Sequence, residues 1–286
     1  MTQIRNIAVA LFIACSADGT RKAGLSVGAG PRASEPRRSP CKPDEIHIPA
    51  GLIRLGTPDS EGAADLDRTV RLASFCIDRT EVTVSKYDLC VTDGACEAPL
   101  HQNVPTGDTP EELECNDRKA DRANYPINCV DWALSDTYCG WLGTRLPTVD
   151  EWEYAARGDS RIYPWGNTPP HGESNMCGSE CKSLLVRDHR FPAGAAYDTD
   201  DGWPTTAPVG SFPLDRSPFG VMDTDGNVAE WTASEFPGFP GYRLMKGAGW
   251  WSQSDFFGNL AVSTPYLETL RSADRGFRCA RSLANQ

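Results

Sequence analysis

A stretch of mixed acidic and apolar residues, positions 219–236, carries side chains suited to binding a cation. It runs FGVMDTDGNVAEWTASEF. Asp223 and Glu230 supply carboxylate oxygens, and Gly226 allows a sharp bend between them. Hard cations such as calcium prefer oxygen ligands. A capped loop beside a core tryptophan explains the same residues equally well. An EF-hand does not, because the sixth and twelfth positions from Asp223 lack the required Gly and Glu.

The cysteine content indicates an exported, disulfide-bonded protein. Eleven cysteines are many for a cytosolic chain, where thiols stay reduced. A zinc site is not favoured, because the chain has no Cys-x-x-Cys pair and only four histidines, His47, His101, His171 and His189.

The N-terminal sequence predicts a signal peptide over residues 1–15. Arg5 is followed by a short apolar run over residues 7–14, which is too short to span a bilayer. Residues 12–15, Phe-Ile-Ala-Cys, resemble the lipobox of bacterial lipoproteins, so we expect Cys15 to carry a lipid anchor. Ordinary secretion is the alternative. Either route places the protein in the bacterial cell envelope, in the periplasm or outside the cell.

Charge and composition divide the rest of the chain into a linker and an acidic body. Residues 16–43 are rich in Gly, Ser, Ala, Arg and Pro and predict a disordered linker, and residues 44–286 form the folded domain. The net charge is −11, and since the first 40 residues hold six basic and two acidic side chains, the remainder carries −15. Such a body is unsuited to nucleic acid. Plain solubility is the simpler explanation of the acidity.

Short elements must position these side chains. Residues 46–56 predict two strands around a Pro-Ala-Gly turn, and residues 75–77 predict another strand. Helices are expected after the N-cap residues Thr83 and Asp131, and after a capping box of Thr148 and Glu151 that opens a helix ending at Gly158. From residue 159 onward the chain predicts loops and short strands. The expected class is α+β.

Ten short motifs, taken in order, resemble the formylglycine-generating enzyme family, also called sulfatase-modifying factors. They cover roughly residues 44–282 and comprise Ile48-Pro49-Ala50-Gly51, Glu81-Val82-Thr83, Val130-Asp131-Trp132, Tyr138-Cys139, Arg145-Leu146-Pro147-Thr148, Glu151-Trp152-Glu153-Tyr154-Ala155-Ala156-Arg157-Gly158, Pro164-Trp165-Gly166-Asn167, Ala207-Pro208-Val209-Gly210, Gly226-Asn227-Val228-Ala229-Glu230-Trp231 and Gly276-Phe277-Arg278-Cys279. Each motif is weak by itself, but the ordered set is specific.

The resemblance implies a single domain related to C-type lectins, with little regular structure, short helices and short antiparallel strands. It also implies two structural calcium sites. The first would use Asn175, Met176, Asp201 and Trp203. The second would use Asp223, Gly226, Val228 and Glu230.

The resemblance further implies a disulfide between Cys139 and Cys279. It closes a loop of over a hundred residues, for which chain entropy predicts about 4–5 kcal/mol of stabilisation. Proximity in sequence pairs Cys90 with Cys96, Cys115 with Cys129 and Cys177 with Cys181, which leaves Cys41 for Cys76.

The chain departs from the family at the copper site. The resemblance implies an enzyme that uses oxygen and copper(I) to oxidise a cysteine of a sulfatase peptide to formylglycine. In the family, two thiolates of the enzyme bind the copper ion. Here Ser252 and Phe257 replace those cysteines, and Gly249 replaces an active-site serine. Soft cuprous ion requires soft sulfur ligands. No cysteine lies between Cys181 and Cys279, so none lies nearby in sequence, and we do not expect copper.

The degenerate site leaves two questions about its remaining side chains. Ser252 is better interpreted as a pocket floor than as a nucleophile, because a nucleophilic serine needs an adjacent base. Trp250, Trp251 and Phe256 are expected to line a ligand cleft, although core packing is the alternative for some of these aromatic residues.

These observations favour an exported, monomeric, non-catalytic module that binds a peptide, protein or glycan at the cell envelope and meets the membrane only through its lipid. The alternative is an oxidoreductase that modifies a sulfatase cysteine through a non-standard site. A purely structural envelope protein is the third hypothesis, and exposure of the aromatic residues in a cleft would argue against it.

Overall fold

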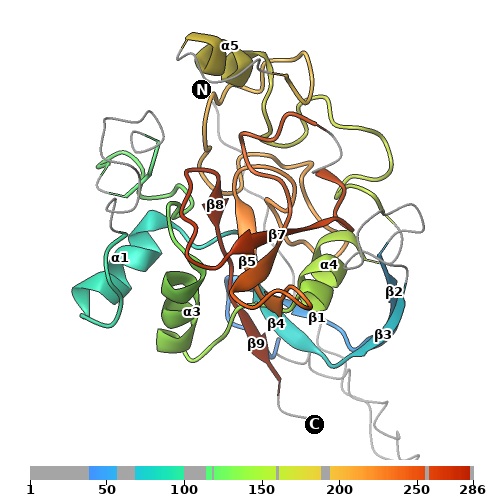
Figure 1. Cartoon of the computed structure of the whole chain (residues 1–286). Coiled ribbons are helices and arrows are strands. Elements are labelled where there is room, and N and C mark those ends of the chain that lie inside the picture. The colour runs from blue at the N-terminus through green and yellow to red at the C-terminus, as the bar shows by residue number, and fades with distance from the viewer. Residues whose placement is uncertain are drawn as a thin grey trace, which may run out of the picture. The chain divides into compact units, whose positions relative to one another are not determined.

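The computed structural model describes residues 39–56, 68–99, 114–117, 119–158, 161–187, 194–254 and 258–283 (Figure 1). In these ranges short helices and strands are joined by long irregular segments, which is the α+β class expected. The helices are Val84–Thr92 (α1), Trp132–Trp141 (α3), Val149–Arg157 (α4) and Ser179–Arg187 (α5). The strands are Glu45–Ile48 (β1), Gly51–Leu55 (β2), Arg68–Leu72 (β3), Phe75–Asp78 (β4), Ala229–Glu235 (β5), Tyr242–Lys246 (β6), Ser263–Leu267 (β7), Arg275–Gly276 (β8) and Ala280–Ser282 (β9).

Three small sheets organise the described chain. The largest has the order β7-β6-β5-β8, antiparallel except for the parallel pair β5–β8. The strands β1 and β2 form on either side of the Pro-Ala-Gly turn, as predicted, but they do not pair with each other. Instead β1 pairs with β4 and β2 pairs with β3. The β1–β4 register sets Ile48 opposite Phe75, and both side chains are buried, which a local hairpin would not achieve.

The predicted helix N-termini are confirmed by their caps. Thr83 accepts a hydrogen bond from the backbone of Lys86 at 3.3 Å, and Asp131 accepts one from Leu134 at 2.9 Å. The capping box of α4 is complete, and α4 ends at Gly158, where φ is 70°. These bonds satisfy amides that a helix leaves unpaired at its start, so the sequence determines these boundaries locally.

The helix α5 was not predicted, because its sequence lacks a long apolar stripe. Leu185 of this helix is fully buried and packs in the same cluster as the Cys177–Cys181 disulfide. The helix is therefore stabilised by packing and a cross-link rather than by its own periodicity.

The core packs around β5, which contacts both α3 and α4 (Figure 1). Trp231 of β5 is fully buried, and its indole N–H donates to the backbone oxygen of Val130 at 2.9 Å. The same cluster holds Phe277 and the Cys139–Cys279 disulfide.

Five disulfides join all ten cysteines of the described residues, in the five pairs expected from the sequence: Cys41–Cys76, Cys90–Cys96, Cys115–Cys129, Cys139–Cys279 and Cys177–Cys181. Cys41 lies a few residues ahead of the expected start of the body at residue 44, so the cross-linked part begins slightly earlier. Cys15, the predicted signal peptide and the predicted linker up to residue 38 lie outside the described residues. Among the described helices, none combines the length and apolar character that crossing a bilayer requires.

Candidate functional site

A pocket of about 340 Å³ lies over the four-stranded sheet. Strand residues from all four strands reach it, and the segment after β6 forms another wall. The lining includes the side chains of Trp251, Ser252, Gln253, Tyr266, Asp274 and Arg275. A second pocket of about 360 Å³ adjoins the first and shares Trp251, Asp274 and Arg275 with it. The described positions of the degenerate copper site, Gly249 and Ser252, therefore lie at a pocket.

Ser252 closes a turn in this segment. Its hydroxyl accepts from the backbone N–H of Gly249 at 3.2 Å, and its own N–H donates to the oxygen of Gly249 at 2.9 Å. Within the described part of the chain the hydroxyl has no other hydrogen bond and no histidine partner. A serine without a base is a poor nucleophile, so its observed role is structural.

Gly249 has no room for a side chain. A Cβ built on it would lie 2.6 Å from the backbone oxygen of Asp274 and 2.9 Å from the Asp274 Cβ. This oxygen is a backbone carbonyl, and it accepts a hydrogen bond from the backbone N–H of Ala229 at 2.8 Å. The position that the resemblance assigns to an active-site serine is thus closed by the turn at Asp274, which directly precedes β8.

The two adjacent tryptophans have different roles. Trp250 is 1% exposed and its indole N–H donates to the backbone oxygen of Ala273 at 3.0 Å, so the cleft role expected for it is wrong and it belongs to the core. Trp251 is half-buried, stacks on Trp250 with ring centroids 6.0 Å apart and lines both pockets. Phe256 and Phe257 lie outside the described residues.

A charged wall faces these residues, and sequence reasoning missed it. Asp274 and Arg275 directly precede the Gly276–Cys279 motif, and that adjacency was the only available signal. The Arg275 guanidinium lies over the Tyr266 ring, 4.0 Å from its centroid. The Nη1 atom of Arg275 is 3.8 Å from Asp274 Oδ1, which is a loose ion pair.

The structure also brings a disulfide beside the degenerate site, although no cysteine is near it in sequence. The backbone N–H of Cys177 donates to the oxygen of Ser252 at 3.0 Å, and the Cys181 sulfur lies 3.7 Å from the oxygen of Trp250. No cysteine is close to Ser252 in the sequence, as stated above for this segment, but the fold brings Cys177 and Cys181 close to it. Both sulfurs are fully buried and bonded to each other.

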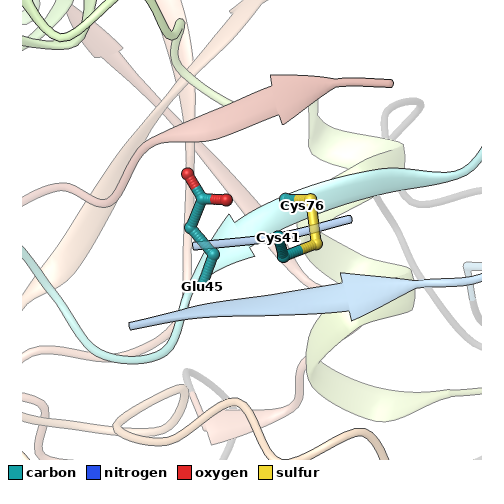
Figure 2. Close-up of side chains that lie close together, drawn as sticks. All are labelled: Cys41, Glu45 and Cys76. Carbon is teal, nitrogen blue, oxygen red and sulfur yellow. A yellow bond between two sulfur atoms is a disulfide. The ribbon is translucent and has the colours of Figure 1, made fainter. Parts of the chain in front are cut away.

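Another pair of cysteines lies near a carboxylate, at Cys41, Glu45 and Cys76 (Figure 2). Figure 2 shows the two sulfurs joined to each other rather than free. Glu45 forms an ion pair with Arg281 at 2.6 Å. The Cys41–Cys76 disulfide cross-links the N-terminal end of the body, so these two sulfurs are not thiolates that could bind a metal.

Two residues of the first set of expected calcium ligands, Met176 and Asp201, contact the hydroxyl of Tyr197. That hydroxyl lies 2.5 Å from Asp201 Oδ2 and 3.2 Å from the oxygen of Met176. Asn175 is 1% exposed, and its Oδ1 atom has no hydrogen-bond donor. Burial raises the pKa of Asp201 to about 7, although the Tyr197 hydroxyl and the Trp203 N–H donate to its two oxygens. Glu180, which the sequence did not single out, adds another buried oxygen without a donor.

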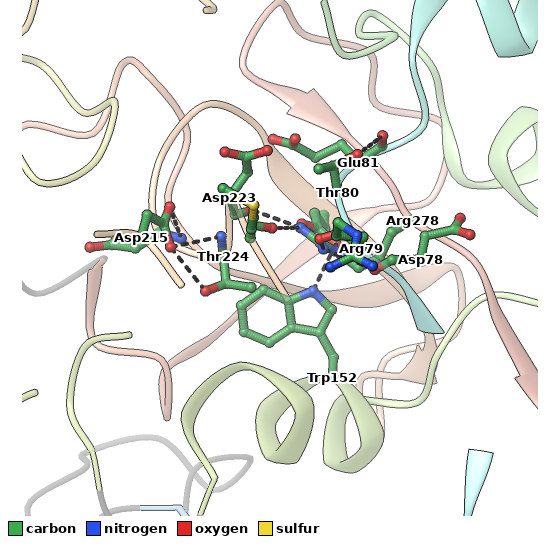
Figure 3. Close-up of polar contacts among 12 residues, drawn as sticks. Asp78, Arg79, Thr80, Glu81, Trp152, Asp215, Asp223, Thr224 and Arg278 are labelled. Carbon is green, nitrogen blue, oxygen red and sulfur yellow. Dashed lines mark hydrogen bonds and ion pairs between the residues drawn. The ribbon is translucent and has the colours of Figure 1, made fainter. Parts of the chain in front are cut away.

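The second set is arranged differently, because an arginine occupies its centre (Figure 3). The Nε–H of Arg278 donates to both carboxylate oxygens of Glu230, at 2.9 and 2.7 Å. The indole N–H of Trp152 donates to one of the same oxygens at 2.7 Å. Arg278 also donates to backbone oxygens of Asp78, Arg79, Met222 and Asp223. With its oxygens already bound by N–H donors, Glu230 fits a calcium ion less well than the first set does.

Buried acids surround this arginine. Glu81 is 1% exposed, and neither of its carboxylate oxygens has a hydrogen-bond donor among the described residues. Burial is the main cause that raises the pKa of Glu81 well above its usual range, and repulsion from Asp223 adds to it. Burial raises the pKa of Asp223 to about 6. Asp215 caps the loop by accepting from the N–H and hydroxyl of Thr224 at 3.1 and 3.2 Å (Figure 3). The loop is therefore capped beside a core tryptophan.

Comparisons with known proteins agree on one family. A family model described as the sulfatase-modifying factor enzyme 1-like domain matches residues 31–283. The inactive C-alpha-formylglycine-generating enzyme 2 of Mus musculus is 29% identical over 84% of this chain and 86% of its own length. The formylglycine-generating enzyme of Streptomyces coelicolor is 28% identical over 82% and 88%. The structure of PvdO from Pseudomonas aeruginosa superposes with a TM-score of 0.62 and 26% identity, over 84% of this chain and 94% of that one.

The close approach at Gly249 predicts that a side chain there is costly. We expect Gly249→Ser to lower the free energy of unfolding by about 1–3 kcal/mol, because Asp274 must move. The control is Gly140→Ser in α3, where a Cβ meets no atom within 4 Å and the change should stay within about 0.5 kcal/mol. Urea unfolding measures both, and equal losses for the two variants would contradict the packing argument.

Proposed function

This chain belongs to the family of sulfatase-modifying factor enzyme 1-like proteins, and we propose that it is a non-catalytic member that binds a ligand in the pocket beside Trp251. The observation that carries the proposal is the chemistry at position 252. A hydroxyl stands there in place of a copper-binding thiolate, and it is engaged in closing a turn with Gly249. The mouse relative named as inactive supports the possibility of non-catalytic members in this family.

The pocket itself supports binding rather than a purely structural role. Its volume of about 340 Å³ falls within the range of small-molecule sites. Trp251 offers a partly exposed aromatic face, and Ser252 and Gln253 add hydrogen-bonding groups at the same wall. Such a mixture suits a peptide, another protein segment or a glycan.

The alternative is that the chain still oxidises a cysteine of a sulfatase-like protein through a non-standard site. The proximity of the Cys177–Cys181 disulfide to Ser252 is the observation that favours it, because reduction would release two thiols there. We consider it second, since those sulfurs are fully buried and form a structural cross-link.

We also propose that calcium binds at Asn175, Met176, Asp201 and Trp203, which gather oxygen atoms suited to a hard cation. The buried Oδ1 of Asn175, which has no donor among the described residues, and the largely buried carboxylate of Asp201 support this assignment. The ion would hold loops in place and take no part in chemistry. A second ion at Asp223 and Glu230 would have to compete with Arg278 for Glu230.

The five disulfides fit an exported protein, and we propose that a lipid on Cys15 anchors it to the bacterial cell envelope. The folded body would then act as a monomer tethered by the linker.

The copper chemistry is tested with a sulfatase-type cysteine peptide, copper(I) and oxygen, and the product is read by mass spectrometry. We expect no formylglycine from the disulfide-bonded protein, with the Streptomyces coelicolor relative as the positive control. A second sample is reduced beforehand. Formylglycine from the intact protein would refute the proposal. Formylglycine only after reduction, and not from a Cys177→Ser, Cys181→Ser variant, would establish the alternative.

Removal of calcium should destabilise the protein. At a calcium concentration 100-fold above the dissociation constant, mass action contributes about 2.7 kcal/mol, so a chelator should lower the unfolding midpoint. We expect Asp201→Asn to abolish this response and to lower the metal content of dialysed protein. The exposed Asp198→Asn serves as the matched control and should keep both. An unchanged midpoint with chelator would argue against the site.

Lipidation is tested by growing bacteria that express the chain with a radiolabelled fatty acid. The wild type should incorporate label and sediment with membranes, whereas Cys15→Ser should lose both properties. Equal labelling of the two proteins would rule out the anchor at Cys15.

A further inference from the structure

We propose that Arg275 makes the pocket selective for a ligand that carries a single carboxylate group. The inference rests on the proposed binding function and specifies the chemistry of the ligand. Two sources share this chemistry, the acidic side chain of a peptide and a free carboxylic acid.

Arg275 has hydrogen-bonding capacity that the protein does not use. Its side chain is 12% exposed, yet none of its guanidinium N–H groups donates a hydrogen bond within the described residues. The Nε atom is buried and lacks an acceptor. The neighbouring carboxylate of Asp274 is 3.8 Å away and instead accepts from the hydroxyl of Ser272 at 2.5 Å. Because the Nε atom is buried, a ligand in the pocket would meet the terminal Nη groups, which donate to no acceptor among the described residues.

Arg278, three residues further along the chain, shows the contrast. It is fully buried, and its guanidinium nitrogens donate to Glu230 and to backbone oxygens. The fold therefore supplies acceptors where an arginine has a structural role. At Arg275 the fold supplies a pocket instead.

The position of Arg275 is fixed before a ligand arrives. Its backbone pairs with Ala229 in the parallel β5–β8 pair, and the face of its guanidinium rests on the Tyr266 ring. Stacking occupies the face and leaves the N–H edge, which matches the two oxygens of a carboxylate. A pre-organised donor loses little conformational freedom on binding.

The surroundings limit the ligand to one negative charge. Asp274 contributes to the same wall and would repel a second anionic group, and the body beyond residue 40 carries a net charge of −15. A polysulfated glycan is disfavoured for both reasons. Trp251 lines both adjoining pockets, so a flat apolar group next to the carboxylate completes the expected ligand.

Two matched pairs of probes test the proposal by isothermal titration calorimetry. One pair is the capped peptide acetyl-Gly-Phe-Glu-Gly-amide and its Gln counterpart. The other is 3-phenylpropanoate and 3-phenylpropanamide. We expect the acid of at least one pair to bind about tenfold or more tightly than its amide, as a charge-assisted hydrogen bond to arginine implies. The pair that discriminates identifies the source of the carboxylate.

Variants assign the effect to Arg275. In Arg275→Gln the acid should bind as weakly as the amide, while amide binding stays unchanged, which also shows that the pocket remains folded. Arg275→Lys should recover part of the preference, because it keeps the charge but loses the planar fork. Lys86→Gln removes the same charge from an exposed pair with Asp44 and should leave the preference intact.

Equal binding of acid and amide in both pairs, or a preference that survives Arg275→Gln, would overturn the carboxylate inference. The proposed binding function would stand in that case, provided that Trp251→Ala weakens binding of both members. If no probe binds, the carboxylate inference falls, and the copper assay still judges the non-catalytic proposal separately. A heparin fragment that binds more tightly than either acid would overturn the inference in favour of a glycan.

Discussion

The buried ion pair between Arg278 and Glu230 is the interaction on which the irregular part of this structure depends. Taking two charges out of water costs several kcal/mol for each ion, and attraction between them compensates only when the remaining hydrogen-bonding groups are also satisfied. Here Arg278 bonds the backbone at residues 78–79 and at residues 222–223 as well as the Glu230 carboxylate. Trp152 of α4 completes the shell of Glu230. One side chain thus joins the end of β4, the acidic loop, β5 and the C-terminal segment, none of which has enough regular structure to hold the others.

The same C-terminal segment delivers the chemistry of the pocket. The short strand β8 begins at Arg275, and the structural arginine follows three residues later, so fixing Arg278 also fixes the backbone that carries Arg275. The two arginines differ in one physical respect, namely whether the fold provides acceptors. That difference separates a side chain that maintains the structure from one that is available to a ligand, and no local property of the sequence distinguishes them.

The described residues at the degenerate copper site have structural roles. At Gly249 the turn at Asp274 approaches too closely for a side chain, and Ser252 is part of a turn. Next to them the Cys115–Cys129 and Cys177–Cys181 disulfides pack in the same cluster as Trp250. A domain made largely of loops needs such cross-links, because its secondary structure buries too little surface to stabilise it.

Features that depend on neighbours along the chain could be predicted from the sequence. They are the helix starts at Thr83, Asp131 and Thr148, the three short-range disulfides and the family motifs, because caps, motifs and residue identities are local or additive. The Cys139–Cys279 pair followed from the family resemblance, and Cys41–Cys76 followed by elimination. Tertiary packing sets the partners of the strands β1 and β2, the helix α5, the burial of Trp250 beside an accessible Trp251, and the proximity of a disulfide to Ser252. It also places Arg278 at the expected cation position beside Glu230 and Arg275 at the pocket. These outcomes rest on contacts between segments far apart in sequence, and burial and charge pairing across such distances leave no periodic signal in a single chain.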